Sequence, residues 1–238
     1  MALSEVQWEA LNPARGDSSP RAGTLWGDRN GSVPTGFLAR FVEGFSSPPH
    51  IHNATYRAVV IRGLLHNDDP AAEPEWMPAG SFWTQPAGDV HITAANAQEN
   101  IALVEIDRGP YLVKPPEAAF DNGERAINVD ASNLVWVEIT GDTGAKIAYL
   151  SGALEAGRLN STFLRLPAGF SGELLNAGNA FHAVVIEGGL SYGGADAKRL
   201  TPGGYFGAAD PSAHAVTTDA QTTLYVRTNG PYEITQHR

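Results

Sequence analysis

The sequence contains two copies of one pattern, and this internal repeat limits what the chain can fold into. The segment GFSSPPHIHNATYRAVVIRG (44–63) aligns without a gap with GFSGELLNAGNAFHAVVIEG (169–188). Upstream, FLARFVEGF pairs with TFLRLPAGF, and downstream, MPAGSFWTQPAGDVH pairs with TPGGYFGAADPSAH. Because these matches occur in the same order, we interpret the chain as a tandem duplication. Each copy is far longer than a solenoid repeat and is expected to form a small domain.

Both copies consist of short apolar runs rather than helical patterns. Runs such as YRAVVIRGLL, NIALVEI, FHAVVIEGGL and TTLYVRT are rich in β-branched residues and are bounded by turn-forming residues. The chain of 238 residues has 26 glycines and 16 prolines, which suits many turns. Such punctuation is typical of β-sandwiches and barrels. The sequence therefore predicts an all-β fold, with one domain over residues 1–120 and a second over 121–238.

Charge and composition argue against several functional classes. The 26 Asp and Glu residues outnumber the 16 Lys and Arg residues, and no basic cluster suits a nucleic acid. No apolar run has the length of a membrane helix, and the first residues lack the features of a signal peptide. The absence of cysteine excludes disulfides and cysteine-ligated metals. We expect a cytoplasmic protein that binds a small molecule; a homodimer is compatible with the sequence, although no segment indicates one.

Two histidines one residue apart, His50 and His52, are candidate metal ligands. Residues two apart in a strand point to the same face, so the two imidazoles would project together. A metal site needs at least one more ligand, and His91, which follows the turn at 86–88, is the best candidate. Taken alone, the spacing of His50 and His52 favours two solvated loop residues over a metal site; His91 beyond the turn and the duplicated β architecture favour the metal site.

The spacing around these histidines resembles the two motifs of the cupin superfamily. The first reads Gly44, five residues, His50-Ile51-His52, three residues, Tyr56, six residues and Gly63. The second reads Gly80, five residues, Pro86-Ala87-Gly88, two residues, His91 and then Asn96, one position late. The whole chain is similar to a bicupin, in particular to cupin-like proteins of the DUF4437 type, which are related to the cupin domain of ChrR anti-sigma factors. The resemblance implies two tandem double-stranded β-helix barrels of the jelly-roll type.

The chain departs from the first motif at one position, because Tyr56 stands where the family has a glutamate ligand. A phenol with an ordinary pKa of about 10 is a poor ligand, so Tyr56 could ligate a metal, donate a hydrogen bond to a bound molecule, or pack in the core. The resemblance then implies a site of His50, His52 and His91 with open positions, similar to acetylacetone- and thiol-type dioxygenases. Fe²⁺ is the first choice of metal, with Zn²⁺, Ni²⁺ or Mn²⁺ as alternatives. Gln85 is a weaker candidate for a contact with the ligand.

The second copy of the repeat serves as an internal comparison. In the ungapped alignment, the site residues His50, His52 and Tyr56 correspond to Leu175, Ala177 and Phe181, and only His91 keeps a histidine partner, His214. A single inward-facing histidine holds a metal poorly. We therefore expect the C-terminal barrel to be degenerate and free of metal.

Three functions fit these observations. The first is a metal-dependent enzyme acting on a small organic substrate, either a dioxygenase or a Lewis-acid isomerase, lyase or hydrolase. The second is a non-catalytic binding or sensor module, and the third is a structural bicupin with a vestigial site. We rank the enzyme first, because the histidine set of the first copy is intact. Arg62 shares a strand face with Tyr56 and is a candidate for neutralising an acidic substrate, whereas His66 is expected to be exposed or capped.

Overall fold

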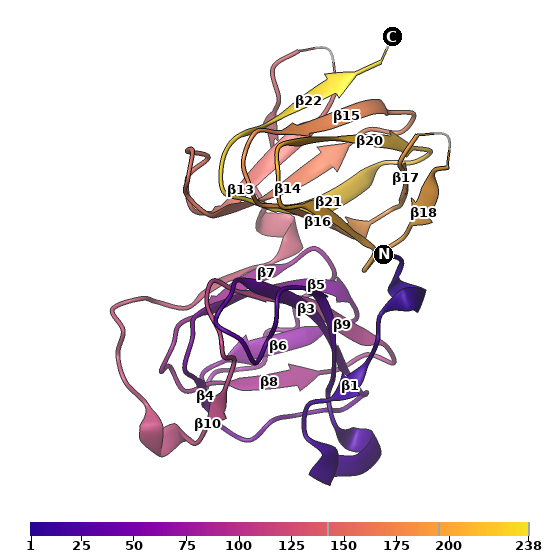
Figure 1. The fold of residues 1–238 in the computed structure, drawn as a ribbon. Coiled ribbons are helices and arrows are strands. Elements are labelled where there is room, and N and C mark those ends of the chain that lie inside the picture. The colour runs from indigo at the N-terminus through magenta and orange to yellow at the C-terminus, as the bar shows by residue number, and fades with distance from the viewer. Residues whose placement is uncertain (142, 195, 238) are drawn as a thin grey trace. The chain divides into compact units, whose positions relative to one another are not determined.

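The computed structural model describes residues 1–141, 143–194 and 196–237, which form two compact units (Figure 1). One unit spans Val6–Asn133, and the other contains Leu134–Arg238 together with Met1–Glu5. Regular structure in the described residues is β-strand with a few short 3-10 helices, which confirms the predicted all-β class. Within the same residues, no helix has the length and apolar character needed to cross a bilayer.

The unit Val6–Asn133 consists of strands in three sheets. The strands are β1 (Glu9–Ala10), β2 (Arg21–Trp26), β3 (Thr35–Phe41), β4 (Ile51–His52), β5 (Tyr56–Arg62), β6 (Leu65–Asp68), β7 (Phe82–Gln85), β8 (Ile92–Ala95), β9 (Asn100–Ile106), β10 (Val113–Lys114) and β11 (Ile127–Val129). The 3-10 helices are η2 (Pro13–Ser18), η3 (Pro116–Ala118) and η4 (Ala131–Asn133). A seven-stranded sheet has the order β1-β2-β3-β9-β5-β7-β11, and β10-β4 and β6-β8 form two-stranded sheets.

The core of this unit follows from strand alternation. In β5, Tyr56, Ala58 and Val60 belong to one buried apolar cluster, whereas Arg57 lies on the opposite face. Neighbouring strands add side chains of the same parity to that cluster, including Phe37, Trp83, Ala102 and Val104. Because alternate side chains of a strand point to opposite faces, the apolar period of two predicts this inner face.

The second unit has a similar two-sheet architecture. Its elements are η1 (Leu3–Glu5), β12 (Val137–Glu138), β13 (Lys146–Ser151), β14 (Asn160–Leu166), β15 (Ser171–Asn176), β16 (Phe181–Glu187), β17 (Leu190–Tyr192), β18 (Lys198–Leu200), β19 (Tyr205–Ala208), β20 (Ser212–Thr218), β21 (Thr222–Thr228) and β22 (Tyr232–Gln236). A six-stranded sheet, β12-β13-β14-β21-β16-β19, faces a five-stranded sheet, β18-β17-β20-β15-β22 (Figure 1). Buried Leu164, Leu174 and Val216 from both sheets form one core between them.

Equivalent turns relate the two units. The Gly44 amide donates a hydrogen bond to the Ala95 carbonyl (3.0 Å), and the Gly169 amide donates one to the Thr218 carbonyl (2.9 Å). Both glycines have positive φ angles, 70° and 72°, which residues with a side chain rarely adopt. These turns start the segment that carries His50 in one unit and β15 in the other. The duplication inferred from the sequence is therefore visible in the backbone.

Candidate metal centre

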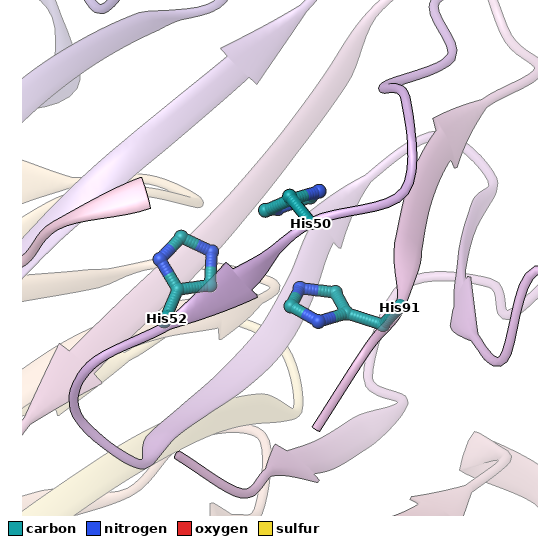
Figure 2. A group of neighbouring side chains, drawn as sticks. All are labelled: His50, His52 and His91. Atoms are coloured by element: carbon teal, nitrogen blue, oxygen red, sulfur yellow. The ribbon is translucent and has the colours of Figure 1, made fainter. Parts of the chain in front are cut away.

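The three predicted histidines converge in the N-terminal unit (Figure 2). His50 directly precedes β4, His52 ends β4, and His91 precedes β8. The backbones of His50 and His91 form an antiparallel bridge, with N–H···O distances of 3.1 and 3.0 Å. Ring centroids lie 4.3 Å apart for His50 and His91, 5.0 Å for His50 and His52, and 5.3 Å for His52 and His91. One ring nitrogen from each histidine lies within 4.8 Å of the others.

Backbone carbonyls orient the same nitrogen of each ring. The Nδ1–H groups of His50, His52 and His91 donate to the carbonyls of Pro48 (2.9 Å), Leu112 (3.2 Å) and Asp89 (3.1 Å). A carbonyl accepts only from a protonated nitrogen, so Nδ1 carries the proton in each neutral ring. Every Nε2 therefore keeps a lone pair. This is the arrangement in which a second partner fixes the tautomer of a metal-binding histidine.

Burial keeps these histidines neutral. His52 and His91 are 4% and 1% exposed, and His50 is half-buried. Burial lowers the pKa of His91 to about 3, with a further contribution from nearby His50. Burial likewise lowers the pKa of His52 well below its usual range, and the neighbouring His91 and His50 add to this effect. The imidazoles are thus unprotonated at neutral pH, as a metal ligand must be.

Tyr56 lies beside the triad and belongs to a buried hydrogen-bond network. Its hydroxyl is 3.4 Å from His91 Nε2 and donates to Asn67 Oδ1 at 2.8 Å. Thr93 donates to the same oxygen at 2.8 Å, and Asn67 Nδ2 donates to Gln85 Oε1 at 2.9 Å. Burial raises the pKa of Tyr56 to about 12, although its polar neighbours act in the opposite direction. Tyr56 is therefore a neutral phenol, and Asn67 links its hydroxyl to the side-chain amide of Gln85.

Tyr111, which the motif spacing did not indicate, covers one side of the triad. Its ring stacks on His52 with centroids 4.3 Å apart and an interplanar angle of 14°. Its hydroxyl lies 3.1 Å from His52 Nε2, and because Nδ1 carries the proton of that ring, the hydroxyl is the donor. Burial raises the pKa of Tyr111 well above its ordinary value, so this phenol is also neutral.

A cavity of about 490 Å³ opens onto the triad, with His50, His52, Tyr56 and Tyr111 in its lining. This volume lies within the range of roughly 300–1,000 Å³ that is usual for small-molecule pockets. The remaining lining is mainly aromatic and aliphatic. The site thus combines three convergent nitrogens with space for an organic molecule.

Two other residues considered from the sequence lie outside the triad. Arg62 is paired with Glu99 at 2.8 Å on the surface and does not line the cavity, so its assignment to an acidic substrate is wrong. His66 is buried rather than exposed, and its Nδ1 accepts a hydrogen bond from the Glu75 amide at 3.2 Å. Of the two expectations for His66, exposed or capped, the structure supports the capped histidine.

The register of the C-terminal unit corrects the ungapped alignment by one residue. Leu174 pairs with His214 as His50 pairs with His91, so Leu174, and not Leu175, occupies the equivalent of His50. The shift arises because four residue steps separate the bridges at Ser46 and His50, whereas three steps separate Ser171 from Leu174. The extra residue lies in the Pro-containing stretch 47–49, an irregularity of the β-bulge kind.

The same register shows what replaces the polar network. Tyr56, Asn67, Gln85 and Thr93 correspond to Phe181, Tyr192, Ala208 and Val216. His214 is left between the Tyr192 hydroxyl (3.2 Å from Nδ1) and the Ser212 hydroxyl (3.1 Å from Nε2). A closely similar sandwich therefore forms without the amides and hydroxyls of the first unit. Because buried polar groups cost free energy unless fully paired, their presence in one unit points to a role beyond folding.

Comparison with solved structures identifies the fold. A proposed dioxygenase from Nostoc punctiforme matches with a TM-score of 0.75 at 15% identity, over 100% of this chain and 86% of that chain. Salicylate 1,2-dioxygenase from Pseudoaminobacter salicylatoxidans gives a TM-score of 0.64 at 14% identity, over 94% and 78% of the two chains. Oxalate decarboxylase from Lactobacillus farciminis gives 0.62 at 11%, over 99% and 87%. At these identities the likeness shows the fold alone, which is that of a bicupin.

The family follows from the sequence itself. The profile of DUF4437, a domain of unknown function, matches residues 1–235. The chain therefore belongs to the DUF4437 family, as its motifs predicted. No curated protein matches the sequence.

Proposed function

We propose that this bicupin is a mononuclear metal enzyme of the dioxygenase type that acts on a small organic substrate. The observation that carries the proposal is the convergence of one ring nitrogen from each of three histidines, two of which line a cavity. His50, His52 and His91 would hold the ion, and their Nδ1–H bonds to backbone carbonyls would keep the rings in place.

The donor set fits a catalytic rather than a structural site. Three protein ligands leave positions open for water and substrate, which distinguishes catalytic metal sites from closed ones. Neutral imidazoles leave the charge of a divalent ion uncompensated, and imidazole suits iron, zinc and nickel. Fe²⁺ remains our first choice, with Zn²⁺, Ni²⁺ or Mn²⁺ as alternatives. Bound there, the ion would supply Lewis acidity and, in the case of iron, redox chemistry with O₂.

Tyr56 would act on the bound molecule as a hydrogen-bond donor by turning its single O–H proton from Asn67 Oδ1, which keeps its bond from Thr93, towards that molecule. Its hydroxyl lies 3.4 Å from His91 Nε2 and is held by Asn67, so it is positioned at the rim of the ligand set. With a pKa of about 12 it keeps its proton at neutral pH. A neutral donor fixed by a buried network can stabilise negative charge that develops on a neighbouring oxygen.

The test is elemental analysis of untagged protein purified without added metal, beside two matched variants. His91→Ala removes a proposed ligand, whereas His214→Ala removes the equivalent histidine of the C-terminal unit. We expect stoichiometric metal in the parent and in His214→Ala and its loss in His91→Ala. Iron in this pattern, with oxygen consumption in a screen of small organic substrates, supports the dioxygenase. Equal metal content in His91→Ala would refute the site, and bound metal without turnover would favour a binding or sensor module.

A further inference from the structure

The charged side chains that line the cavity beside the triad are all basic. Arg15 and Arg29 are the only charged side chains among the described residues that line it, and neither Asp nor Glu takes part. The whole chain, by contrast, has an excess of acidic residues, 26 against 16 basic ones. A positively charged cavity in an acidic protein selects anions, because low-dielectric walls focus the field of its cations.

Arg29 is the more deeply placed of the two arginines. Its side chain is 11% exposed, and its guanidinium carbon lies 5.4 Å from the centre of the Phe37 ring. One end, Nη2, contacts Glu9, whose side chain is 65% exposed. Within the described part of the chain, the Arg29 Nε is buried without a hydrogen-bond partner. A buried guanidinium N–H without a partner is stabilised by a ligand that accepts from it.

Arg29 and the triad share the same neighbours. The Tyr111 amide donates to the Arg29 carbonyl at 2.9 Å, and the Tyr111 hydroxyl reaches His52 Nε2 at 3.1 Å. Phe37 contacts both Arg29 and Tyr111. Its ring centroid lies 5.4 Å from that of Tyr111, and the Arg29 guanidinium lies over its face. A molecule lying along Tyr111 would thus have Arg29 at one end and the histidines at the other.

Most of the other side chains that line the cavity are apolar. Phe41 and Phe45 line the cavity with ring centroids 5.2 Å apart, and Leu112 lines it near the entrance with 44% of its surface exposed. The guanidinium of Arg15 lies over the Phe45 ring, 5.3 Å from its centre, on the exposed η2 segment. Such a lining suits a hydrocarbon or aromatic body between two polar ends.

We propose that the cavity binds an organic carboxylate with an apolar body, and that Arg29 is the residue that anchors the carboxylate. Planar guanidinium groups bind carboxylates through two parallel hydrogen bonds, which gives both affinity and orientation. Arg15 at the entrance adds attraction for the same charge. The inference deepens the proposed function by naming a substrate class, but the binding step requires no metal.

The test compares a carboxylic acid with its uncharged amide. Binding of 3-phenylpropionate and 3-phenylpropionamide is measured by isothermal titration calorimetry, on the protein as purified and after chelator treatment. We expect the acid to bind at least about tenfold more tightly than the amide, as a charge-assisted hydrogen bond predicts. Arg29→Gln should abolish the preference, and Arg62→Gln, which removes an arginine outside the cavity, should leave it unchanged.

A second variant keeps the test valid if Arg29→Gln does not fold. Glu9→Gln removes the carboxylate that competes for Arg29 and should strengthen binding of the acid without affecting the amide. Equal affinity for acid and amide, no binding of the acid at millimolar concentration, or an intact preference in Arg29→Gln would each overturn the proposal. A retained preference in a protein that contains no metal as purified would count against the metal enzyme and leave the carboxylate site standing.

Discussion

At the scale of the residue, Tyr56 distinguishes this site from a motif with a glutamate ligand. The C-terminal unit carries Phe181 at the same register position, so Tyr56→Phe should fold. The change removes one donor from Asn67 Oδ1, which keeps its bond from Thr93, and should lower the free energy of unfolding by about 1 kcal/mol. We expect metal content to persist and turnover to fall. Loss of metal in elemental analysis would instead identify Tyr56 as a ligand.

His182 supports a prediction about pH. It lies in the C-terminal unit with its Nδ1 2.9 Å from the Tyr205 hydroxyl, and burial, reinforced by Arg227, lowers its pKa from 6.5 to about 4. Between these two values the unfolded chain binds a proton that the native state excludes. Neutral His182 therefore contributes its full stabilisation when the pH is above its pKa in the unfolded chain. This contribution, about 3 kcal/mol at most, is lost as the pH falls towards its pKa in the folded protein.

Comparison with His182→Asn isolates this contribution, because every other histidine is common to both proteins. Urea unfolding at neutral pH and near the folded pKa should show a larger loss of stability in the parent than in the variant. A loss of equal size in both proteins would show that His182 does not carry it.

Residue-level prediction from the sequence succeeded where the spacing was sharp. His50, His52 and His91 were expected to lie together and do so, because two follow from strand parity and the third from a turn. Asn67 and Tyr111 were missed. Asn67 stands in a polar stretch, HNDDP, that reads as an exposed loop although the residue is 2% exposed, and Tyr111 lies in the loop between β9 and β10. Neither local pattern nor spacing encodes such a contact.

At the scale of the element, the repeat predicted the strands better than their register. The ungapped alignment pairs Tyr56 with Phe181 correctly, since both begin long, regular strands, β5 and β16. It fails at His50, where the Pro-containing stretch before β4 holds one residue more than β15 needs. An extra residue in an irregular segment cannot be seen in an ungapped alignment when a later loop of the other copy is longer by one residue. The strand register of the structure was therefore needed to find it.

The turns that join these strands can be tested with a matched pair of glycines. Gly63 and Gly44 both have positive φ, 84° and 70°. An added Cβ at Gly63 would lie 2.3 Å from the Glu99 carbonyl oxygen and from Asn100 Oδ1, whereas at Gly44 it would meet nothing within 4 Å. Gly44→Ala should cost about 1 kcal/mol of unfolding free energy, and Gly63→Ala clearly more, because a clash adds to the backbone strain. Chemical denaturation measures both; equal costs would contradict the role of the Gly63 contacts.

At the scale of the whole molecule, the duplication gave two units of one architecture in which only the first contains the triad. Composition and strand punctuation were sufficient to predict the all-β class, because short β-branched runs have few other ways to bury their apolar faces. The contrast between the units could be predicted only in part. The sequence alone shows that the second unit lacks counterparts of His50, His52 and Tyr56. The residues that replace Asn67, Gln85 and Thr93 can be identified only from the strand register of the structure.

This asymmetry leads to a prediction about metal and stability. A ligand that binds only the native state raises the free energy of unfolding, by about 2.7 kcal/mol at a free concentration of 100 times Kd. The effect should fall on the unit Val6–Asn133, because the triad lies within it. In a Trp136→Phe variant, the remaining tryptophans, Trp8, Trp26, Trp76 and Trp83, all belong to that unit and report on it alone. Their thermal transition should move to higher temperature when Zn²⁺ is added to chelator-treated protein. The same shift in a Trp136→Phe protein that also carries His91→Ala would place the metal outside the triad, and no shift in either would mean that the three lone pairs do not hold an ion.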